Sequence, residues 1–488
     1  MSDNPKYKLT VGIETHVQLK TKSKLFSGAD NATLDAEPNT LVNHIDFGLP
    51  GALPVLNAKA IELASKAAFA LNSRPRSFSK FDRKHYFYPD LPMGYQISQY
   101  DEPIILGGYV EFNLDGQTKR INLTRAHLEA DAGKSVHPEG ADYSLVDLNR
   151  AGTPLLEIVS EPEMHSADEA KAYAHELYLL IRYAGVSDAN LYYGNMRFDV
   201  NVSVSLTDEL GTRTETKNLN SFKAVERAII FETARQIELL EKGEKIVQET
   251  RGWNDTKGKG YSMRSKENAD DYRYMPDPDL PPVELSDKYI ADIEASMPKL
   301  PKYWRESLDK FGLVSSITES LIEGEIEYGL ANLEYIGTLE ADLAKTVANW
   351  VVNIELPIRK KLSEQNAQVK LANQDVRKVY KAVYQLYIDS RLSSTNIKEL
   401  LNKLLESENL PENIEDYAAQ AGLMQESDEG KLGGIVDKVL ADNSKAVEDI
   451  KAGEQKAVGF LVGQVMKASK GQANPGVVNE LIKSRIKS

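Results

Sequence analysis

The sequence predicts an α+β protein in which a turn-rich region with strands comes first and a helical region follows. Two distributions support this division: all seven histidines lie at or before His175, and only three of the twenty prolines follow Pro301. The segment PDPDLPP at 276–282 marks the boundary, because prolines at this density end helices and stiffen a connector. We therefore expect three domains, at 1–295, 296–410 and 411–488, of which the first contains the strands and the other two are helical.

The composition indicates a globular protein of several domains and excludes cysteine chemistry. A chain of 488 residues is too long for a single core, and 41% hydrophobic and 27% charged residues are ordinary contents. With no cysteine, the chain has no disulfide, thiolate metal site or cysteine nucleophile. Residues 1–10 lack the apolar run of a signal peptide, and no segment is apolar for long enough to cross a bilayer. We therefore expect a cytoplasmic protein with no membrane partner.

Charge is unevenly distributed along the chain. The net charge of −14 disfavours a general nucleic-acid coat. From residue 451 onward, however, seven cations stand against only Glu454 and Glu480. Such a segment either docks a polyanion or is a solvated surface, and the sequence leaves both interpretations open. The cations are Lys451, Lys456, Lys467, Lys470, Lys483, Arg485 and Lys487.

The first predicted strand, at 7–19, brings an acid and a histidine to one face. Its alternate residues are apolar and form a buried face. They are Tyr7, Leu9, Val11, Ile13, Val17 and Leu19. Glu14 and His16 then lie together on the opposite face, where a carboxylate and an imidazole two residues apart can share a ligand. The alternative is an ordinary surface pair.

The stretch at 196–220 combines a strand pattern with residues suited to a metal and a phosphate. From Phe198 the alternate residues are apolar, 207–211 favour a turn, and 213–219 can form the second arm of a hairpin. A five-residue loop would place Glu215 opposite Ser203 and Lys217 opposite Asn201. The resulting polar face suits a phosphate bound through a hard metal ion, or it is a solvated outer face. Its members are Arg197, Asp199, Asn201, Glu215 and Lys217.

Two further segments are expected to present polar groups from strands. At 121–131 the alternation changes phase, after which one face carries Arg125, His127, Glu129 and Asp131. The GKS at 133–135 resembles the end of a phosphate loop, but Leu128 stands where that motif needs glycine, which excludes a P-loop. Residues 143–161 read as two short strands around a turn, which present Asp147, Arg150 and Glu157.

The remaining segments are predicted to be one unusual loop and a series of helices. Residues 80–99 are dense in aromatic and cationic groups and are interrupted by prolines, which favours an ordered functional loop. Arg273 is a candidate for contacting phosphate or a carboxylate, although it could instead pair with a local acid. Predicted helices begin at the caps Asn57 and Ser166 and recur at 221–242, 339–352, 375–386 and 477–486.

Eight long motifs are spread over essentially the whole chain. They are GIETHVQL at 12–19, GLPGALPVLN at 48–57, KFDRKHYFYPDLP at 80–92, HLEADAGKS at 127–135, LVDLNRAGTPLLEIVSEPEM at 145–164, TKNLNSF at 216–222, DYRYMPDPDLPP at 271–282 and GFLVGQVMKASKGQANP at 459–475. In these motifs the sequence resembles the family of B subunits of aspartyl/glutamyl-tRNA amidotransferases. Their length makes chance similarity improbable.

The resemblance implies a fold and an activity. The fold would be an antiparallel-sheet cradle, like that of glutamine synthetase and the guanidino kinases, followed by a helical domain and a YqeY-like helical tail that binds tRNA. The activity would be that of a ligase. ATP phosphorylates the side-chain carboxylate of Glu-tRNA(Gln) or Asp-tRNA(Asn), and ammonia from the glutaminase, which is the A component, then amidates it. A small C component would complete a heterotrimer.

The residue patterns and the resemblance together suggest roles for the polar residues. A carboxylate that attacks ATP needs a divalent metal and cations to neutralise both anions, and water must be kept away. We expect Mg²⁺ to be held by Glu14, His16, Glu129, Asp199 and Glu215. The nucleotide would be bound by Arg197, Lys217 and Asn201, and catalytic cations at the phosphates or along an ammonia path would be Lys80, Lys84 and Arg273. Because Mg²⁺ prefers oxygen ligands, His16 either binds the ion directly or contacts a residue that does.

The sequence departs from the family pattern at two places. Many members carry a Cys-x-Cys and a Cys-x-x-Cys pair, and the corresponding positions here are Ser27, Ala29, Asn43 and Asp46. No structural zinc is therefore expected, since thiolates are missing. Where the family often has two consecutive acids, this chain has Glu129 followed by alanine, so the second acidic role passes to Glu129 or Asp131.

Two rival functions stay open on the sequence. A tRNA-binding scaffold without chemistry of its own would explain the basic tail equally well, but it gains little from clustered acids beside a polyanion. A metal-dependent hydrolase is disfavoured, because the chain has no HExxH motif and no nucleophile elbow. ATP cleavage distinguishes the amidotransferase from both rivals, since a scaffold shows no cleavage and a hydrolase needs no tRNA.

Overall fold

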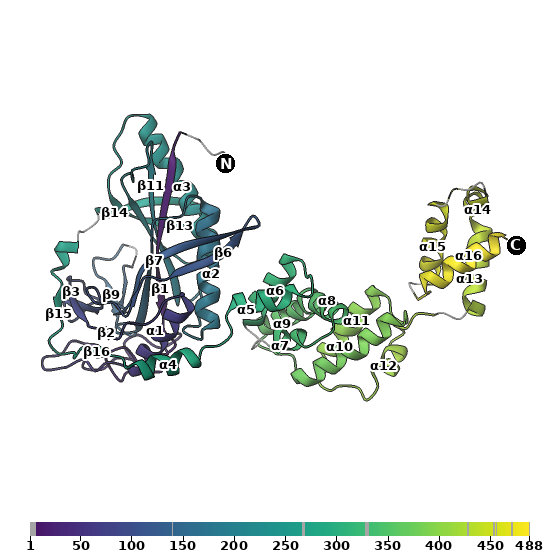
Figure 1. Cartoon of the computed structure of the whole chain (residues 1–488), viewed down its shortest axis with the longest axis horizontal. Coiled ribbons are helices and arrows are strands. Elements are labelled where there is room, and N and C mark those ends of the chain that lie inside the picture. Colours follow the sequence, from purple (N-terminus) through teal and green to yellow (C-terminus); the bar gives the residue numbers. More distant parts are fainter. Residues whose placement is uncertain are drawn as a thin grey trace. The chain divides into compact units, whose positions relative to one another are not determined.

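The computed structural model divides into two compact units, Met1–Pro301 and Lys302–Ser488 (Figure 1). It describes residues 6–138, 140–265, 269–326, 331–426, 429–451, 454, 456–469 and 472–487. Lys470 of the basic segment lies outside the described residues. The strands all lie in the first unit, and the described part of the second is helical, so the predicted α+β class is confirmed. The further boundary near 410 stays a prediction.

A twelve-stranded sheet forms the first unit, in the order β14-β13-β12-β11-β1-β10-β7-β4-β3-β15, with β5 and β6 also paired to β7. The pairings are antiparallel except for that of β12 with β13. The strand bounds are β1 Lys8–Gln18, β3 Asp82–His85, β4 Tyr95–Ser98, β5 Ile105–Leu106, β6 Tyr109–Leu114, β7 Gln117–Ala130, β10 Pro154–Ser160, β11 Met196–Ser205, β12 Thr214–Leu219, β13 Glu249–Asn254, β14 Lys259–Ser265 and β15 Met275–Pro276. Two small sheets pair β2 (Phe78–Ser79) with β16 (Val283–Glu284) and β8 (Lys134–Val136) with β9 (Leu145–Asp147).

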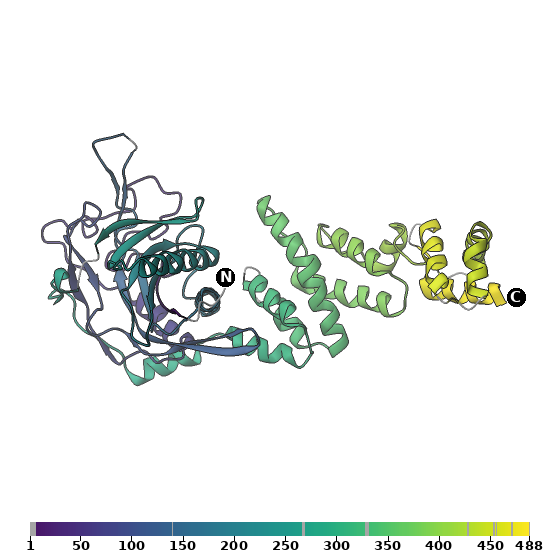
Figure 2. The ribbon, with the colours of Figure 1, turned by 90° about the horizontal axis from the view of Figure 1, so that it is seen from above.

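The core of this unit lies between one face of the sheet and its helices, of which α2 and α3 run beside the strands (Figures 1 and 2). The helices are α1 Ala58–Ala70, α2 Ala167–Tyr183, α3 Phe222–Glu241 and α4 Asp287–Ala295. The strand alternation explains this packing, because Ile13 of β1 and Val200 of β11 are buried on the core face while Glu14 and Asp199 point to the other. The predicted caps are confirmed, since Asn57 accepts from the Lys59 N–H and Ser166 from the Glu169 N–H.

The predicted register of the β11–β12 hairpin is wrong. The structure pairs Glu215 with Asn201 rather than with Ser203. The connection runs from the end of β11 at Ser205 to the start of β12 at Thr214, so it is longer than five residues. Gly211 packs directly on β11, where a Cβ would lie 2.2 Å from the Val204 carbonyl oxygen. The polar residues of both arms still share one face, because the slip is an even number of positions.

The aromatic segment at 80–99 is more regular than predicted. It contains the short strands β3 and β4, which pair with each other and join the main sheet through β15 and β7. The prolines at 89 and 92 fall in the connection between the two strands, where no ladder hydrogen bond is lost. The prediction of a loop without strands is therefore wrong for both arms and holds only for their connection.

The second unit is built from helices, as predicted after Pro301. They are α5 Pro301–Asp309, α6 Ser315–Glu325, α7 Ala331–Gly337, α8 Ala341–Trp350, α9 Leu356–Glu364, α10 Asn373–Ile388, α11 Ser394–Leu405, α12 Ile414–Gln420, α13 Glu429–Asp442, α14 Ser444–Lys451, α15 Lys456–Ala468 and α16 Pro475–Lys487, with a π-helical turn at Val351–Glu355. The last four helices share a small core that includes Val436, Leu461 and Ile482. Nowhere in the described ranges does a helix have the length and apolarity to span a membrane.

Candidate active site

The face of the sheet opposite the core brings polar residues of distant segments together. Antiparallel pairing sets His16 of β1 between Glu157 of β10 and Arg197 of β11, and Glu14 next to Asp199. On the next strand, β7, His127 lies opposite Glu157. Side chains directly opposite each other on one sheet face are close enough to interact, so the register by itself assembles a site.

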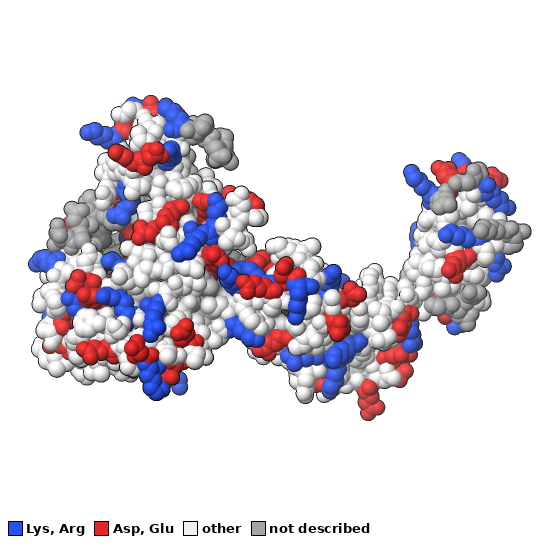
Figure 3. Space-filling model, in the orientation of Figure 1, with Lys and Arg blue, Asp and Glu red and all other residues white. Residues whose placement is uncertain are grey.

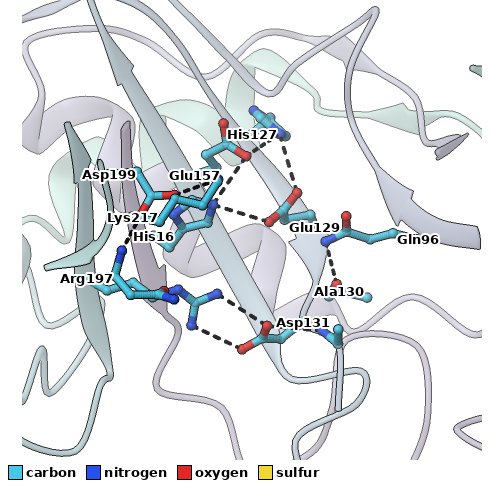
Figure 4. A network of polar contacts seen from close by, with 12 residues as sticks. His16, Gln96, His127, Glu129, Ala130, Asp131, Glu157, Arg197, Asp199 and Lys217 are labelled. Carbon is cyan, nitrogen blue, oxygen red and sulfur yellow. Dashed lines mark hydrogen bonds and ion pairs between the residues drawn. The ribbon is translucent and has the colours of Figure 1, made fainter. Parts of the chain in front are cut away.

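Glu14, His16, Glu157 and Arg197 line a cavity of about 490 Å³ within the first unit, and Figure 4 shows the polar contacts around His16. Strands β1, β7, β10, β11 and β12 contribute acidic and basic side chains to its wall, and the segment around Tyr272 and Tyr274 contributes aromatic rings. The lining residues are Glu14, His16, Lys84, Tyr86, Gln96, Tyr100, Glu129, Asp131, Ala132, Arg150, Glu157, Arg197, Arg213, Glu215, Lys217, Gln248, Thr250, Tyr272 and Tyr274.

One group in the cavity has the composition of a metal site. Ligand atoms of His16, Glu129 and Glu157 all lie within 4.8 Å of one another. The His16 Nε2 atom is 3.6 Å from Glu157 Oε2 and 3.8 Å from Glu129 Oε1, and the three side chains are at most 15% exposed. Two carboxylates and an imidazole can hold a divalent cation such as Mg²⁺ or Mn²⁺, with water or substrate oxygens completing the shell. We call these three residues the acid pair with His16.

The charges of the acid pair with His16 depend on one another: burial opposes the charge on His16, but Glu157 outweighs it and raises the pKa of His16. Burial, followed by the neighbouring Glu157 carboxylate, raises the pKa of Glu129 to about 7. Burial opposes ionisation of Glu157 as well, but His127 and His16 outweigh it and hold the pKa of Glu157 well below its usual range. Burial lowers the pKa of His127 to about 4. A buried carboxylate beside a second carboxylate resists ionisation, and a bound cation would stabilise its ionised form.

Lys84 is a buried cation that interacts electrostatically with the acid pair with His16. Burial opposes its charged form, but Glu129 and Glu157 outweigh burial and raise the pKa of Lys84. Its ammonium lies over the Tyr272 ring, 4.7 Å from the centroid, and over the Tyr86 ring at 5.8 Å. The ammonium is thereby held in the cavity beside the carboxylates.

A second group of acids in the site is already in contact with a lysine. The Lys217 Nζ atom lies 2.9 Å from Asp199 Oδ2 and 3.3 Å from Glu215 Oε1. Asp199 also accepts from the Asn218 N–H at 2.8 Å, and Glu215 from the Thr250 hydroxyl at 3.1 Å. Burial opposes the charge on Lys217, but Asp199 and Glu215 outweigh it and raise its pKa. We call Lys217, Asp199 and Glu215 the lysine cluster.

A third group places two arginines at the cavity. Asp131 lies 3.3 Å from Arg197 Nη2 and 3.4 Å from Arg150 Nε. Arg150 also donates to the carbonyls of Ala132 at 3.0 Å and Gly133 at 2.6 Å, which fixes its guanidinium. Burial opposes the charge on Asp131, but Arg197 and Arg150 outweigh it and lower the pKa. Together the two arginines and Asp131 keep a net positive charge, which suits an anionic ligand.

Two smaller hollows adjoin the cavity at opposite ends of one face of β1. A hollow of about 250 Å³ is lined by Thr10 and Gly12 and shares Glu14 with the cavity. A hollow of about 440 Å³ is lined by Gln18 and shares Arg150 and Arg197 with it. Because residues 10, 12, 14, 16 and 18 lie on the same strand face, the three spaces follow one another along β1.

The structure gathers most of the predicted site residues but not all of them. Glu14, His16, Lys84, Glu129, Arg197, Glu215 and Lys217 line the cavity. Asp199 is buried beneath Lys217, and Asn201 donates to Glu14 Oε1 at 2.9 Å and lines the smaller hollow. Neither Lys80 nor Arg273 lines the cavity: Lys80 pairs with Asp101 at 2.7 Å, and Arg273 lies over the Phe87 ring. Their predicted catalytic roles gain no support from this placement.

Sequence reasoning did not select Glu157, His127, Arg150, Tyr272 or the Tyr86 ring as site residues. The strand pattern could have identified Glu157, because apolar alternation in the motif LLEIVS leaves this carboxylate alone on the polar face of β10. What the sequence does not contain is the register that sets Glu157 beside His16. The tyrosines carried no signal beyond their abundance.

Comparison with known proteins places the chain in a family. The family model described as the GatB/GatE catalytic domain matches residues 9–291, and the one described as the GatB domain matches residues 334–486. A protein of Carboxydothermus hydrogenoformans is 42% identical over 494 residues, which cover 98% of this chain and 99% of that protein. One of Alkalilimnicola ehrlichii is 46% identical over 487 residues, with 99% and 100% covered, and one of Geotalea uraniireducens is 45% identical over 493 residues, with 99% of each covered. All three are named as the B subunit of aspartyl/glutamyl-tRNA(Asn/Gln) amidotransferase.

The full-length coverage and the catalytic-domain match agree with the resemblance seen in the motifs, and the cavity occupies the matched segment. The chain therefore belongs to the family of B subunits of the aspartyl/glutamyl-tRNA(Asn/Gln) amidotransferases.

Proposed function

We propose that this chain performs the ATP-dependent step of tRNA amidation in the cavity. The side-chain carboxylate of Glu-tRNA(Gln) or Asp-tRNA(Asn) attacks the γ-phosphorus of ATP, and ADP leaves. Ammonia then attacks the acyl phosphate carbon, and phosphate leaves with the formation of the amide. The observation that carries this proposal is the acid pair with His16, whose composition suits a metal ion, together with Lys84, Lys217 and Arg197 in the same cavity.

The fit of Mg²⁺ rests on the donor set of the acid pair with His16. His16 and Glu129 keep their predicted role, and Glu157 joins them. Glu14 and Glu215 line the same cavity, but Glu215 and Asp199 are already paired with Lys217, and we assign them to orienting that lysine. When bound, Mg²⁺ would neutralise phosphate oxygens.

The cations of the cavity can each neutralise an anion that the reaction brings in. Lys84 lies between the aromatic rings and the acid pair with His16, where an incoming carboxylate or γ-phosphate would meet it. Lys217 and Arg197 are held by Asp199 and Asp131, so their charge is fixed before substrate arrives. Cations fixed in advance stabilise developing charge without reorganisation.

The two hollows along β1 suit two substrates that approach from opposite ends. The one beside Gly12 has apolar walls from Ile13, Val159 and Leu210 and fits the nucleoside of ATP. The one beside Arg150 has amide groups and Tyr193 in its wall and fits the 3′ end of an aminoacyl-tRNA. Their phosphate and carboxylate groups would then meet above His16.

The family assignment supports the wider context of the reaction. We propose that the first unit is a cradle related to glutamine synthetase and the guanidino kinases, and that the end of the second unit is a YqeY-like tail that contacts tRNA. The chain would work in the cytoplasm, in a heterotrimer with the glutaminase (the A component), which supplies ammonia, and the small C component. Lys80 and Arg273 stay candidates only for an ammonia path outside the cavity.

ATP cleavage by the assembled complex tests the proposal. With the A and C components present, we expect ADP to form when misacylated Glu-tRNA(Gln) or Asp-tRNA(Asn) is added and to be negligible without it. No cleavage, with tRNA binding intact, would instead indicate a scaffold without chemistry of its own. Cleavage that ignores tRNA would indicate a hydrolase.

A further inference from the structure

We propose that Lys24 and Asp46 fasten the loop over residues 27–46 without a metal ion, and that Lys24 is a positioning residue for Arg150 at the cavity. The second half of this proposal rests on the function proposed above. It concerns the positions at which many family members carry paired cysteines, here Ser27, Ala29, Asn43 and Asp46.

These positions do not fit a structural zinc ion. Ser27 donates its hydroxyl to Asp46 Oδ1 at 2.9 Å, and the backbone N–H of Asn43 donates to Asp46 Oδ2 at 2.9 Å. Ala29 offers only a methyl group. The set therefore contains one carboxylate whose oxygens already accept hydrogen bonds, and no thiolate or imidazole, which structural zinc requires.

A buried lysine supplies the positive charge at this place. The Lys24 side chain is 0% exposed, and its Nζ atom lies 3.3 Å from Asp46 Oδ2. Burial lowers the pKa of Lys24 while the Asp46 carboxylate opposes that shift. A lysine without contact to water needs such a partner, so each member of the pair holds the other in place.

The Lys24–Asp46 pair packs directly on the turn that carries Arg150. Lys24 Nζ also donates to the Leu148 carbonyl at 3.4 Å, and the Leu25 N–H donates to the Gly152 carbonyl at 2.8 Å. A Cβ on Gly152, whose φ is +83°, would lie 3.0 Å from Asp46 Oδ1. The pair therefore touches the chain on both sides of Arg150.

The rest of the loop strengthens this contact. The Asn39 side chain accepts from the Leu148 N–H at 2.8 Å, and the Asn149 side chain accepts from the Leu41 N–H at 2.8 Å. Arg150 in turn reaches Asp131 and the cavity. A shift of the loop would consequently move the guanidinium, and a displacement of about 1 Å costs up to about 100-fold in rate.

Metal content tests the first half independently of any activity. We expect mass spectrometry of the metals in the purified complex to find clearly less than one zinc for each copy of this chain. Its Tm should not change when a zinc-selective chelator is added in excess Mg²⁺. Stoichiometric zinc in this chain, with a lower Tm after chelation, would overturn the metal-free assignment.

A double-mutant cycle tests the second half. Lys24→Met should lower tRNA-dependent ATP cleavage by about tenfold or more, whereas the same change in an Arg150→Ala background should cost less than about twofold. Lys22→Met changes an exposed lysine two positions before Lys24; it is the matched control and should leave cleavage unchanged. Equal losses in both backgrounds would overturn the positioning role.

Two further variants keep the test decisive. If Lys24→Met does not fold, Lys24→Met with Asp46→Asn removes both charges and should restore the fold, because no buried charge is left alone. The cycle is then run with that double variant. If Arg150→Ala leaves ATP cleavage intact, Arg150 does not contribute to the reaction at the cavity and the positioning role of Lys24 is wrong, whereas the metal measurement is unaffected.

Discussion

The acid pair with His16 and the lysine cluster differ in how their carboxylates are neutralised, although they share a sheet face and a cavity. In the lysine cluster, Lys217 lies 2.9 Å and 3.3 Å from two carboxylates. In the acid pair with His16, two histidines lie 3.5–3.9 Å from Glu129 and Glu157, and burial lowers the pKa of His127 to about 4. Lys217 is in direct contact with both carboxylates of its cluster, whereas among the described residues neither Glu129 nor Glu157 makes an ion pair with a lysine or an arginine. Clustered acids alone therefore do not point to a metal site, and the lack of a directly paired lysine or arginine is the better guide to a candidate.

The largest effect is expected at the acid pair with His16. Glu157→Gln keeps the shape of the side chain but removes a charge that would face the metal, so ATP cleavage should fall by about 10³-fold. The measurement is tRNA-dependent ADP formation together with Mn²⁺ affinity. Glu226→Gln, which alters a surface pair with Lys171, is the control and should change neither. Full activity of Glu157→Gln would show that this carboxylate does not hold the ion.

The lysine cluster should respond first in stability. Lys217→Met leaves Asp199 and Glu215 buried without their cation, which costs about 3–5 kcal/mol in the free energy of unfolding of the first unit. Urea unfolding measures the loss, and Asp199→Asn in the same chain should recover part of it. Lys171→Met removes an exposed pair and should cost at most about 1 kcal/mol. Similar losses for both lysines would mean that Lys217 is not a structural counter-charge.

Glu215→Ala tests whether the lysine cluster acts separately from the acid pair with His16, and its expected effect on activity is smaller. Because Glu215 acts through Lys217, we expect a loss of about 10–100-fold in transamidation with Mn²⁺ affinity retained. Isothermal titration with Mn²⁺ and an amidation assay on the same preparation provide the comparison. Loss of Mn²⁺ binding would restore Glu215 as a ligand, and normal amidation would remove it from the site.

The basic tail also contains paired and unpaired charges, and the smallest of the predicted effects is expected there. In the described part of the tail, Arg485 pairs with Asp437 at 3.3 Å, whereas Lys456, Lys467 and Lys483 are exposed and make no ion pair there. Both signs of charge are visible on the tail face in Figure 3. Changing the three lysines to Gln should weaken tRNA binding and reduce its salt slope by about 1 for each phosphate that is no longer neutralised.

Arg485→Gln is the matched control for the tail and should leave that salt slope nearly unchanged, since its charge is already paired. An unchanged slope in the triple variant would count against tail contacts with phosphate. Point substitutions are preferable to removal of the residues after 453. That position lies outside the described residues, and the cut would take α15 and α16 away from the core that they share with α13.

Alternation along single strands predicted much of the site. It placed Glu14 and His16 on the polar face of β1, and Arg197, Asp199 and Asn201 on that of β11, because a strand with one buried face fixes the direction of every side chain. Pairing between distant strands could not be predicted in this way. The hairpin register depended on a loop length that turn residues do not specify, and Glu157 gains its role only from its register with His16.

The predicted catalytic cations Lys84 and Lys80 differ in the partners that the fold gives them. Lys84 reaches the acid pair with His16 across β4, which no local pattern reveals, while Lys80, four residues earlier, is held by the nearby Asp101. Composition marked both as members of a cationic segment and could not distinguish them. The departure of Ser27, Ala29, Asn43 and Asp46 from the cysteine pattern was visible in the sequence, but the buried Lys24 beneath them was not.

The position of a bound Mn²⁺ ion tests the central claim most directly. Crystals of the complex soaked with Mn²⁺ and an ATP analogue would show the ion by its anomalous signal. We predict a peak between His16, Glu129 and Glu157, with none within the lysine cluster. A peak at Asp199 and Glu215, with the acid pair with His16 empty, would contradict the account.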